Sequence, residues 1–490
     1  MQIRLIALAA LMAAGSAHAL SPADIAGYRA AGTLKEIKVG GASAQRLFIA
    51  SYAQSICNPG NFDVHHDLNG SKVGSDYRAY SCTLSTTVGA WAAGTPVVIY
   101  KTDKGGSANG VFPILDATAP GVVPFLNVED ASCVRTANPT PAVDILKPSY
   151  TCANSSAVAA TPHAGVSDVE PSIIVKPVNG GANQATSQLD VKAVNLSLFG
   201  IAVTKTLYRA LQEQQGIISA GAAMVDVPAD QSTWDASVMA TIPTLPSAFV
   251  TQALSGNVKG STANVPGWNA VIGAAVDPAV ASKQVNVCRR EVGSGTQAAA
   301  QLHFLNNPIA AGTGAIAPAA DNGVAIAQVG TLAVKADSST GNLVANCLTP
   351  AETNAAYALG IISRENNPRA NNGNAAWRFV KIDGAAPHPS VARDGSYGYL
   401  YAATMQFNKT LVTATSPEGK FIAAMRTNAG KPSSMNKFDI DNQYGYLSLP
   451  STYTGLYSDL SDPVAIKFGS RVERTSAPAA NSATPLRLVK

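Results

Sequence analysis

Charged residues are scarce in this 490-residue sequence: Asp, Glu, Lys and Arg make up 13%, and the formal net charge is +4. Such a balance lacks the basic excess that attracts nucleic acid. The four tryptophans are scattered and do not form a stripe with basic residues. We therefore expect no nucleic-acid partner.

Long hydrophobic runs are also missing, apart from the apolar run Leu5–Ala14 near the start. That run follows Arg4 and precedes Ala17-His18-Ala19, which has the A-x-A form of a cleavage site. Residues 1–19 are thus predicted to be a secretory signal peptide. The run is too short to span a bilayer, and no cysteine follows the cleavage site to carry a lipid. We expect an exported protein, periplasmic or extracellular, without a membrane span.

Cysteine is infrequent, with six residues, and none of them forms a C-x-x-C pair. Zinc ligation is therefore not indicated. An even number of cysteines in an oxidising compartment predicts three disulfides, although six cysteines allow many pairings. Our hypothesis pairs nearest neighbours along the chain: Cys57 with Cys82, Cys133 with Cys152, and Cys288 with Cys347.

Signs of an active site are lacking too. None of the glycine-rich loops matches the Gly-x-Ser-x-Gly elbow of serine hydrolases. His65-His66-Asp67 has metal-ligand chemistry but no helical i, i+4 partner, so we expect these residues to be exposed in a loop. We expect no catalytic residues, no metal and no cofactor.

Short apolar runs rich in β-branched residues alternate with helical patterns, which predicts an α/β fold with mostly parallel sheets. Two segments, 57–163 and 306–346, look like insertions, and the tail 475–484 is predicted to be disordered. The predicted strands are 35–39, 97–100, 173–175, 199–203, 285–288 and 399–402, and helical spacing is found at 47–56, 207–211 and 249–255.

Four strand-like runs end in loops of small residues that contain serine. Glycine lets a backbone approach a ligand closely, and the free N–H groups at a helix start bind an oxyanion. Serine and threonine hydroxyls add donors, and an arginine fork can hold two anion oxygens. Together the loops predict an anion site, although each one alone is typical of an ordinary turn or helix cap. The loops are Val39–Ala44, Tyr100–Gly110, Ala164–Asp168 and Arg290–Thr296.

The last of these loops resembles a known motif. Arg290–Thr296 reads Arg-Glu-Val-Gly-Ser-Gly-Thr and resembles the Arg-x-x-Gly-Ser-Gly-Thr loop of the phosphate-binding proteins of bacterial ABC importers. Gly165–Asp168 is similar to that family's Gly-Ala-Ser-Asp, the Gly106-Ser107 loop to its Gly-Ser-rich turn, and Ser43-Ala44 to its first loop. The segments 249–271 and 394–407 resemble further blocks of the family.

The resemblance implies a two-lobe periplasmic binding protein type II fold, here a divergent member with inserted disulfide-bearing loops. Lobe 1 would comprise 20–203, with the insertion at about 57–163, and 400–490; lobe 2 would comprise 204–399. The implied function is capture of phosphate or a related oxyanion in the inter-lobe cleft, for delivery to an ABC permease. The implied ligand-binding residues are Ser43, Ala44, Gly106, Ser107 and Asp168 from one lobe and Arg290, Ser294, Gly295 and Thr296 from the other.

Two positions bear on the ligand. A carboxylate beside a dianion is repulsive unless the ligand has a proton to donate, so Asp168 favours hydrogen phosphate over sulfate. The alternative is that Asp168 merely caps the turn before Glu170-Pro171. Val292 stands where the family usually has an aspartate that accepts from the ligand. This leaves open a secreted or surface scaffold without a tight ligand and, as a further alternative, a phosphoesterase.

Overall fold

The structure is a computed structural model. It describes residues 20–70, 72–137, 147–256, 258, 267–307, 325–329, 332–369, 375–437, 444–476, 479–480 and 482–490. The predicted signal peptide (1–19) and residues 308–324 of the second predicted insertion lie outside these ranges. Within them, no helix combines the length and the apolarity that a membrane crossing requires.

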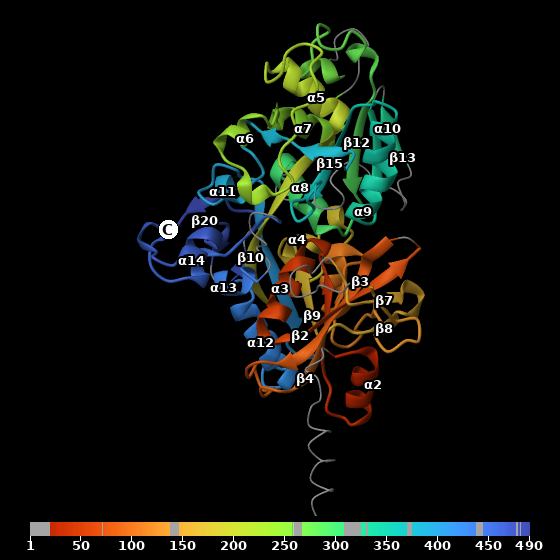
Figure 1. Ribbon diagram of the computed structural model, residues 1–490, viewed down its shortest axis with the longest axis vertical. Coiled ribbons are helices and arrows are strands. Elements are labelled where there is room, and N and C mark those ends of the chain that lie inside the picture. Colours follow the sequence, from red (N-terminus) through yellow and green to blue (C-terminus); the bar gives the residue numbers. More distant parts are fainter. Residues whose placement is uncertain are drawn as a thin grey trace, which may run out of the picture.

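One mixed sheet of 15 strands runs through the described part of the molecule and confirms the α/β class (Figure 1). Its order is β13-β14-β12-β15-β10-β18-β9-β1-β4-β3-β2-β7-β6, and β16 (Trp377–Phe379) and β19 (Tyr446–Leu447) pair with β10 outside this path. The strands of the path are β1 Lys35–Gly41, β2 Cys57–Asn69, β3 Lys72–Leu84, β4 Pro96–Thr102, β6 Val134–Arg135, β7 Tyr150–Ala153, β9 Ala164–Ser167, β10 Leu189–Thr204, β12 Val285–Arg290, β13 Ala325–Val329, β14 Leu332–Asp337, β15 Ala358–Ser363 and β18 Leu400–Asn408.

Strand β10 joins two groups of parallel strands that run in opposite directions. Its first part, Leu189–Leu198, pairs antiparallel with β18, which in turn pairs antiparallel with β9; β9, β1 and β4 are parallel to one another. Its last part, Phe199–Val203, pairs antiparallel with β15, and β15, β12 and β14 are parallel. The carboxyl ends of both groups therefore point toward the middle of β10.

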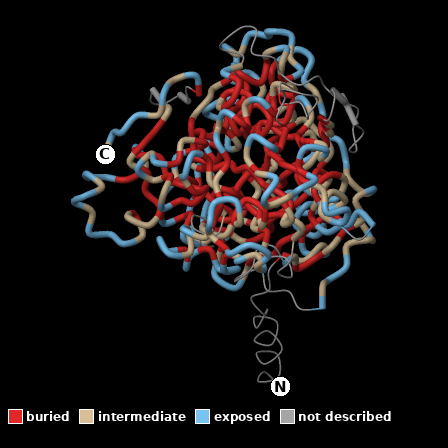
Figure 2. Tube along the Cα trace, turned by 90° about the horizontal axis from the view of Figure 1, so that it is seen from above, coloured by how far each residue is buried: buried red, intermediate tan, exposed pale blue. Residues whose placement is uncertain are grey.

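Helices cover both halves of this sheet. In α3 the apolar residues Leu47, Phe48, Tyr52 and Ile56 are buried, as their spacing predicts. One hydrophobic core surrounds the last part of β10 with β12 and β15, and a second lies between β1, β4, α3 and α12; Figure 2 shows buried residues filling the interior. The main helices are α2 Pro22–Ala30, α3 Arg46–Ile56, α4 Pro171–Ile174, α5 Lys205–Gln214, α6 Ala236–Ala240, α7 Ser247–Leu254, α8 Gly295–Leu305, α9 Thr340–Leu343, α10 Thr349–Thr353, α11 Pro389–Ala392, α12 Pro417–Asn428, α13 Pro432–Met435 and α14 Pro463–Phe468.

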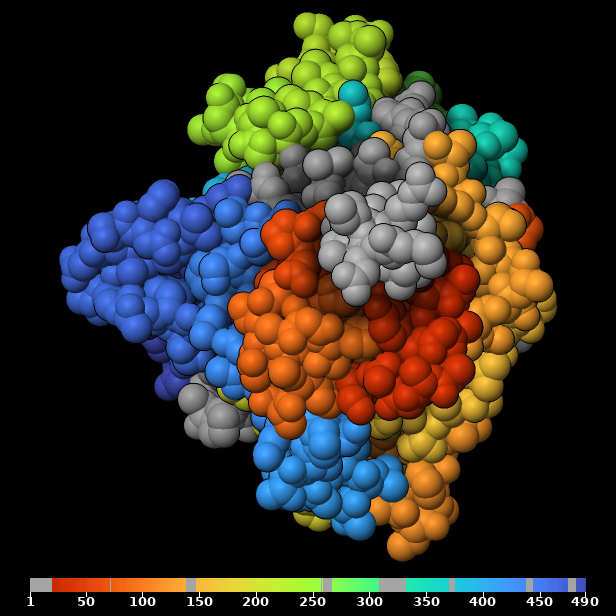
Figure 3. Space-filling model, turned by 60° about the horizontal axis from the view of Figure 1, so that its bottom comes forward, coloured from red at the N-terminus to blue at the C-terminus, as the bar shows by residue number. Residues whose placement is uncertain are grey.

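Segments from the two ends of the chain lie side by side in the half that holds β1 and β4. Figure 3 shows C-terminal residues (blue) beside N-terminal ones (red and orange). The pairing of β18 with β9, which in turn pairs with β1, accounts for this neighbourhood. The exact lobe boundaries, 20–203 with 400–490 and 204–399, stay a prediction.

Most predicted elements are present, with two corrections. The predicted strand Ile173–Val175 is wrong, because Pro171 starts the short helix α4 there, and a brief apolar run does not by itself distinguish strand from helix. The predicted disorder of the tail is wrong for the described part: 475–476 pairs with 479–480, and Ser482 is buried and donates its N–H to Glu170 at 2.9 Å.

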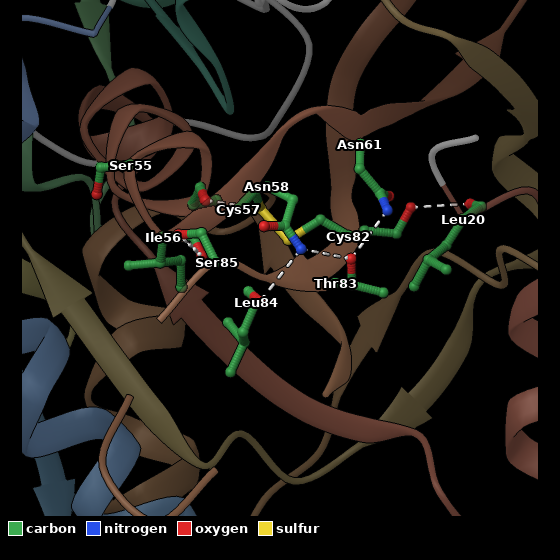
Figure 4. Close-up of a disulfide and its surroundings, with 12 residues drawn as sticks. Leu20, Ser55, Ile56, Cys57, Asn58, Asn61, Cys82, Thr83, Leu84 and Ser85 are labelled. Carbon is green, nitrogen blue, oxygen red and sulfur yellow. Dashed lines mark hydrogen bonds between the residues drawn. A yellow bond between two sulfur atoms is a disulfide. The ribbon is translucent and has the colours of Figure 1, made fainter. Parts of the chain in front are cut away.

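The first predicted insertion is not simply a loop. Its strands β2 and β3 form a long antiparallel hairpin within the main sheet. The disulfide Cys57–Cys82 joins these two strands, and the Asn58 and Asn61 amides beside it donate to Thr83 Oγ1 at 3.0 and 2.8 Å (Figure 4). Disulfides Cys133–Cys152 and Cys288–Cys347 complete the predicted set of three.

The expectation of an exposed loop at His65-His66-Asp67 is wrong. These residues lie on β2 and are at most 3% exposed. Two of the three side chains have polar partners: Asp67 Oδ1 accepts from Tyr77 N at 3.1 Å, and His65 shares a hydrogen bond with Ser81. Neither ring nitrogen of His66 has a hydrogen-bond partner among the described residues. Burial lowers the pKa of His65 to about 3, so its ring is uncharged. Among the described residues, no group of three His, Cys, Asp or Glu side chains could hold a metal ion.

Candidate functional site

The residues predicted to bind an anion follow the carboxyl ends of parallel strands. In one group, Ser43 follows β1, Ser107 follows β4 and Asp168 follows β9 directly. In the other group, Arg290 ends β12, and α8 begins at Gly295. Since both groups point toward the middle of β10, these loops face each other, as ligand loops do at the carboxyl ends of α/β sheets.

Asp168 is the centre of the contacts on the first side. Its backbone N–H donates to Ser107 Oγ at 3.1 Å. Its Oδ1 accepts from Gln45 Nε2 at 3.2 Å, and Gln45 also donates to Ser197 Oγ of β10 at 2.9 Å. Asn195 of β10 donates to Gln45 Oε1 at 2.8 Å. The middle of β10 thus forms a polar floor that fixes the carboxylate.

The second side touches the first directly. Thr296 Oγ1 lies 3.5 Å from Asp168 Oδ2, and Ala108 N donates to Gly293 O at 2.9 Å. A Cβ built on Gly295 would lie 2.1 Å from Ser107 Oγ and 2.8 Å from Asp168 Oδ2. The structure therefore brings Ser107, Asp168, Gly295 and Thr296 together from the two groups of strands.

We expect Gly295→Ala to lower the free energy of unfolding by about 1 to 3 kcal/mol, the usual cost of overpacking. The added methyl group would meet Ser107 and Asp168, which backbone contacts hold in place. The matched control is Gly27→Ala in α2, where a Cβ meets nothing within 4 Å and alanine is the better helix former. Urea unfolding of both variants measures the difference; equal stabilities would show that the two sides are not packed as described.

Arg290 supplies the positive charge beside this cluster and is 1% exposed. Its Nη2 donates to Ser338 O at 2.6 Å, and its Nη1 donates to Thr340 Oγ1 at 3.3 Å. Burial lowers its pKa, whereas the nearby carboxylates Glu291, Asp168 and Glu365 act in the opposite direction. A buried guanidinium fixed in this way can bind an anion without further ordering.

Asp168 is not a helix cap, contrary to the simpler alternative. The cap position of α4 is Glu170, and the Asp168 side chain bonds Gln45 instead. The pKa of Asp168 is raised to about 6: burial is the largest cause and Glu365 acts in the same direction, while the Gln45 hydrogen bond, Arg290 and Lys101 lower it. Asp168 is therefore ionised at pH 8 and neutral at pH 5.

The remaining predicted residues have other surroundings. Ser43 starts the short turn Ser43–Gln45, from which Gln45 is the side chain that bonds Asp168. Ala44 O accepts from the Tyr446 hydroxyl. Ser294 caps α8 by accepting from Gln297 N at 3.4 Å and so satisfies one of the first amides of that helix, which have no intrahelical partners. Gly106 packs against Ser294: a Cβ built there would lie 3.2 Å from Ser294 Cα.

Val292 does not compensate for the aspartate that it replaces. The residue is 36% exposed, and its side chain lies beside Gly180. The acceptor that the resemblance places here therefore has no substitute at this position.

Three further residues of the site were not predicted from the sequence. Gln45 directly follows the predicted residue Ala44. Lys101 of β4 is fully buried, and its Nζ donates to Gly41 O at 2.8 Å and to Asp103 Oδ1 at 2.8 Å, which links two of the loops. Glu365 lies two residues beyond the end of β15, next to β12 in the sheet. Position after a parallel strand was the signal that could have found Glu365.

Comparisons with known proteins find distant structural similarities but no sequence matches. No protein-family model and no curated protein matches the sequence. Among solved structures, a protein described as a phosphate ABC transporter substrate-binding protein with bound phosphate, from Clostridium perfringens, is 11% identical with a TM-score of 0.38, over 82% of this chain and 96% of that one. An ABC-type phosphate transport receptor from Vibrio cholerae is 10% identical with a TM-score of 0.36, over 84% and 100%. Structural similarity at this level of sequence identity does not identify the ligand of this chain.

Proposed function

We propose that this chain is an exported solute-binding protein that captures an oxyanion, with phosphate as the preferred anion. The observation that carries the proposal is the meeting of Ser107 and Asp168 with Gly295 and Thr296, beside the buried Arg290. The amides at the start of α8 and the two hydroxyls are donors, and the guanidinium supplies charge. We call these five residues the anion site.

Export is part of the proposal. Three disulfides are typical of proteins that fold in an oxidising compartment. The predicted signal peptide agrees with this, and an ABC permease would be the partner that receives the anion. No covalent step is proposed: the Thr296 hydroxyl and the Asp168 carboxylate, 3.5 Å apart, serve here as donor and acceptor for the anion.

Isothermal titration with phosphate, sulfate and arsenate, on protein first freed of bound anion, tests the proposal. We expect heat of binding with phosphate and arsenate. No heat with any of the three would contradict anion capture and favour the scaffold alternative. The missing acceptor at Val292 would then agree with a loss of tight ligand binding. Hydrolysis of an aryl phosphate that disappears in Arg290→Ala would instead support a phosphoesterase.

The state of Asp168 predicts the selectivity. At pH 8 the ionised carboxylate accepts a hydrogen bond from hydrogen phosphate but repels sulfate, so phosphate should bind at least about tenfold more tightly. Below pH 6 the carboxyl group becomes a donor, and the preference should shrink. Competition titrations at pH 8 and pH 5 measure this ratio.

The control for selectivity is Asp168→Asn, which is neutral and can donate at every pH. Its ratio should be close to one and change much less with pH. Equal affinities for phosphate and sulfate in the unmodified protein at pH 8 would rule out Asp168 as the selecting group.

A further inference from the structure

A cavity adjoins the anion site. It has a volume of about 290 Å³, well above what a single small anion fills, and lies between the two groups of strands. Thr340, which accepts from Arg290 Nη1 at 3.3 Å, is part of its wall, so the cavity begins where the guanidinium ends. Its lining includes Arg46, Thr340, Glu365, Asn366, Pro368 and Trp377.

Glu365 is the unusual member of this lining. It is 4% exposed, and neither carboxylate oxygen has a hydrogen-bond partner among the described residues. The nearest cation is Arg46, whose Nη2 lies 3.9 Å from Glu365 Oε1, beyond hydrogen-bond distance; that Nη2 donates to Asn366 instead, at 3.2 Å. A buried carboxylate without hydrogen bonds is costly, and a donor brought by a ligand would satisfy it.

Side chains of opposite charge lie at the two ends of the path from the anion site into the cavity. Arg290 presents a positive charge at one end and Glu365 a negative charge inside. The two are close enough that Glu365 acts on the pKa of both Arg290 and Asp168. The ring of Trp377, 3% exposed, adds an aromatic wall against which an alkyl stem or an ammonium group can pack.

We infer that the ligand is a zwitterion: a phosphate monoester or phosphonate whose short alkyl stem carries a primary ammonium group. The phosphoryl oxygens bind the anion site, and the ammonium group donates to Glu365 in the adjoining cavity. This inference rests on the proposed function and narrows it from inorganic phosphate to an amino-bearing organic phosphate.

Three probes test the inference by isothermal titration: inorganic phosphate, 2-aminoethyl phosphate and 2-hydroxyethyl phosphate. The two esters are close in size and differ in the ammonium group. In the unmodified protein, 2-aminoethyl phosphate should bind at least about tenfold more tightly than 2-hydroxyethyl phosphate, as for a charge-assisted hydrogen bond. Equal affinities for the two esters would overturn the inference.

Glu365→Gln is the decisive variant, because it keeps the shape and removes the charge. Its preference for the amino ester should fall to within about threefold, while its affinity for inorganic phosphate is retained. Glu418→Gln on α12, outside the cavity, is the matched control and should keep the full preference. An unchanged preference in Glu365→Gln would overturn the inference even if the amino ester binds well.

The outcomes separate the two proposals. Binding of inorganic phosphate without any preference between the esters would leave the proposed function standing and defeat the zwitterion. Absence of binding by all three probes would defeat the proposed function and the inference with it. A melting curve for each variant confirms that it is folded before titration.

Discussion

Arg290→Ala is expected to weaken anion binding by about 2 to 5 kcal/mol, which is roughly thirtyfold to a few thousandfold in the dissociation constant. The size follows from the burial of the guanidinium: it is 1% exposed and fixed by Ser338 and Thr340, so it interacts with an anion without the screening of water. Isothermal titration with phosphate, or with whichever anion binds most tightly, measures the loss.

Arg290→Lys and Arg289→Lys form the matched pair for this experiment. Arg289 is equally buried, but it lies on the alternate face of β12, and burial alone accounts for its lowered pKa, whereas carboxylates act on the pKa of Arg290. Lysine at 290 keeps the charge but loses the fork and should still weaken binding, while lysine at 289 should leave affinity within a few fold. Equal losses at both positions would mean that the wrong arginine has been assigned.

Asp168→Asn is expected to raise the free energy of unfolding of the anion-free protein by up to about 3 kcal/mol at pH 8 and to leave it nearly unchanged at pH 4. The folded protein raises the pKa of Asp168 from 3.8 to about 6, mainly through burial. A carboxyl group with a raised pKa contributes stability that is complete below about pH 4 and is lost as the pH rises through about 6. Asparagine stays neutral and avoids this loss.

Urea unfolding at several pH values between 4 and 8 measures this effect. Asp394→Asn is the control, because Asp394 is exposed near the end of α11 and its charge should not matter to the pH profile. If wild type and Asp168→Asn show the same stability difference at pH 4 and pH 8, the carboxylate is not destabilised by its surroundings.

Much of the fold could be predicted from local patterns. β1, β4 and β12 are short strands with β-branched residues, each followed by a loop that contains serine, and α3 has a clear helical spacing of apolar residues. The three disulfides followed from the even number of cysteines and from nearest-neighbour pairing. Such features depend on residues close together in sequence.

The failures come from long-range packing. His65 and His66 look like surface residues because nothing nearby in sequence reveals that β2 becomes an interior strand between β3 and β7. Several loop glycines expected to approach a ligand instead let loops approach each other; a Cβ on Gly165 would lie 1.7 Å from Gly110 O. Gln45 has no signal of its own in the sequence and is recognised only from its hydrogen bond to Asp168, whereas Glu365 could have been found from its position after a parallel strand.

The Cys288–Cys347 disulfide bears on how the Arg290 guanidinium is held in position. Cys288 precedes Arg290 by two residues on β12, and Cys347 follows Ser338 and Thr340, the residues that hold its side chain. The sulfur bridge thus closes a covalent ring around those contacts. A chain that kept its thiols would hold Arg290 by hydrogen bonds alone, so formation of this disulfide in an oxidising compartment would restrain the segment that positions the guanidinium.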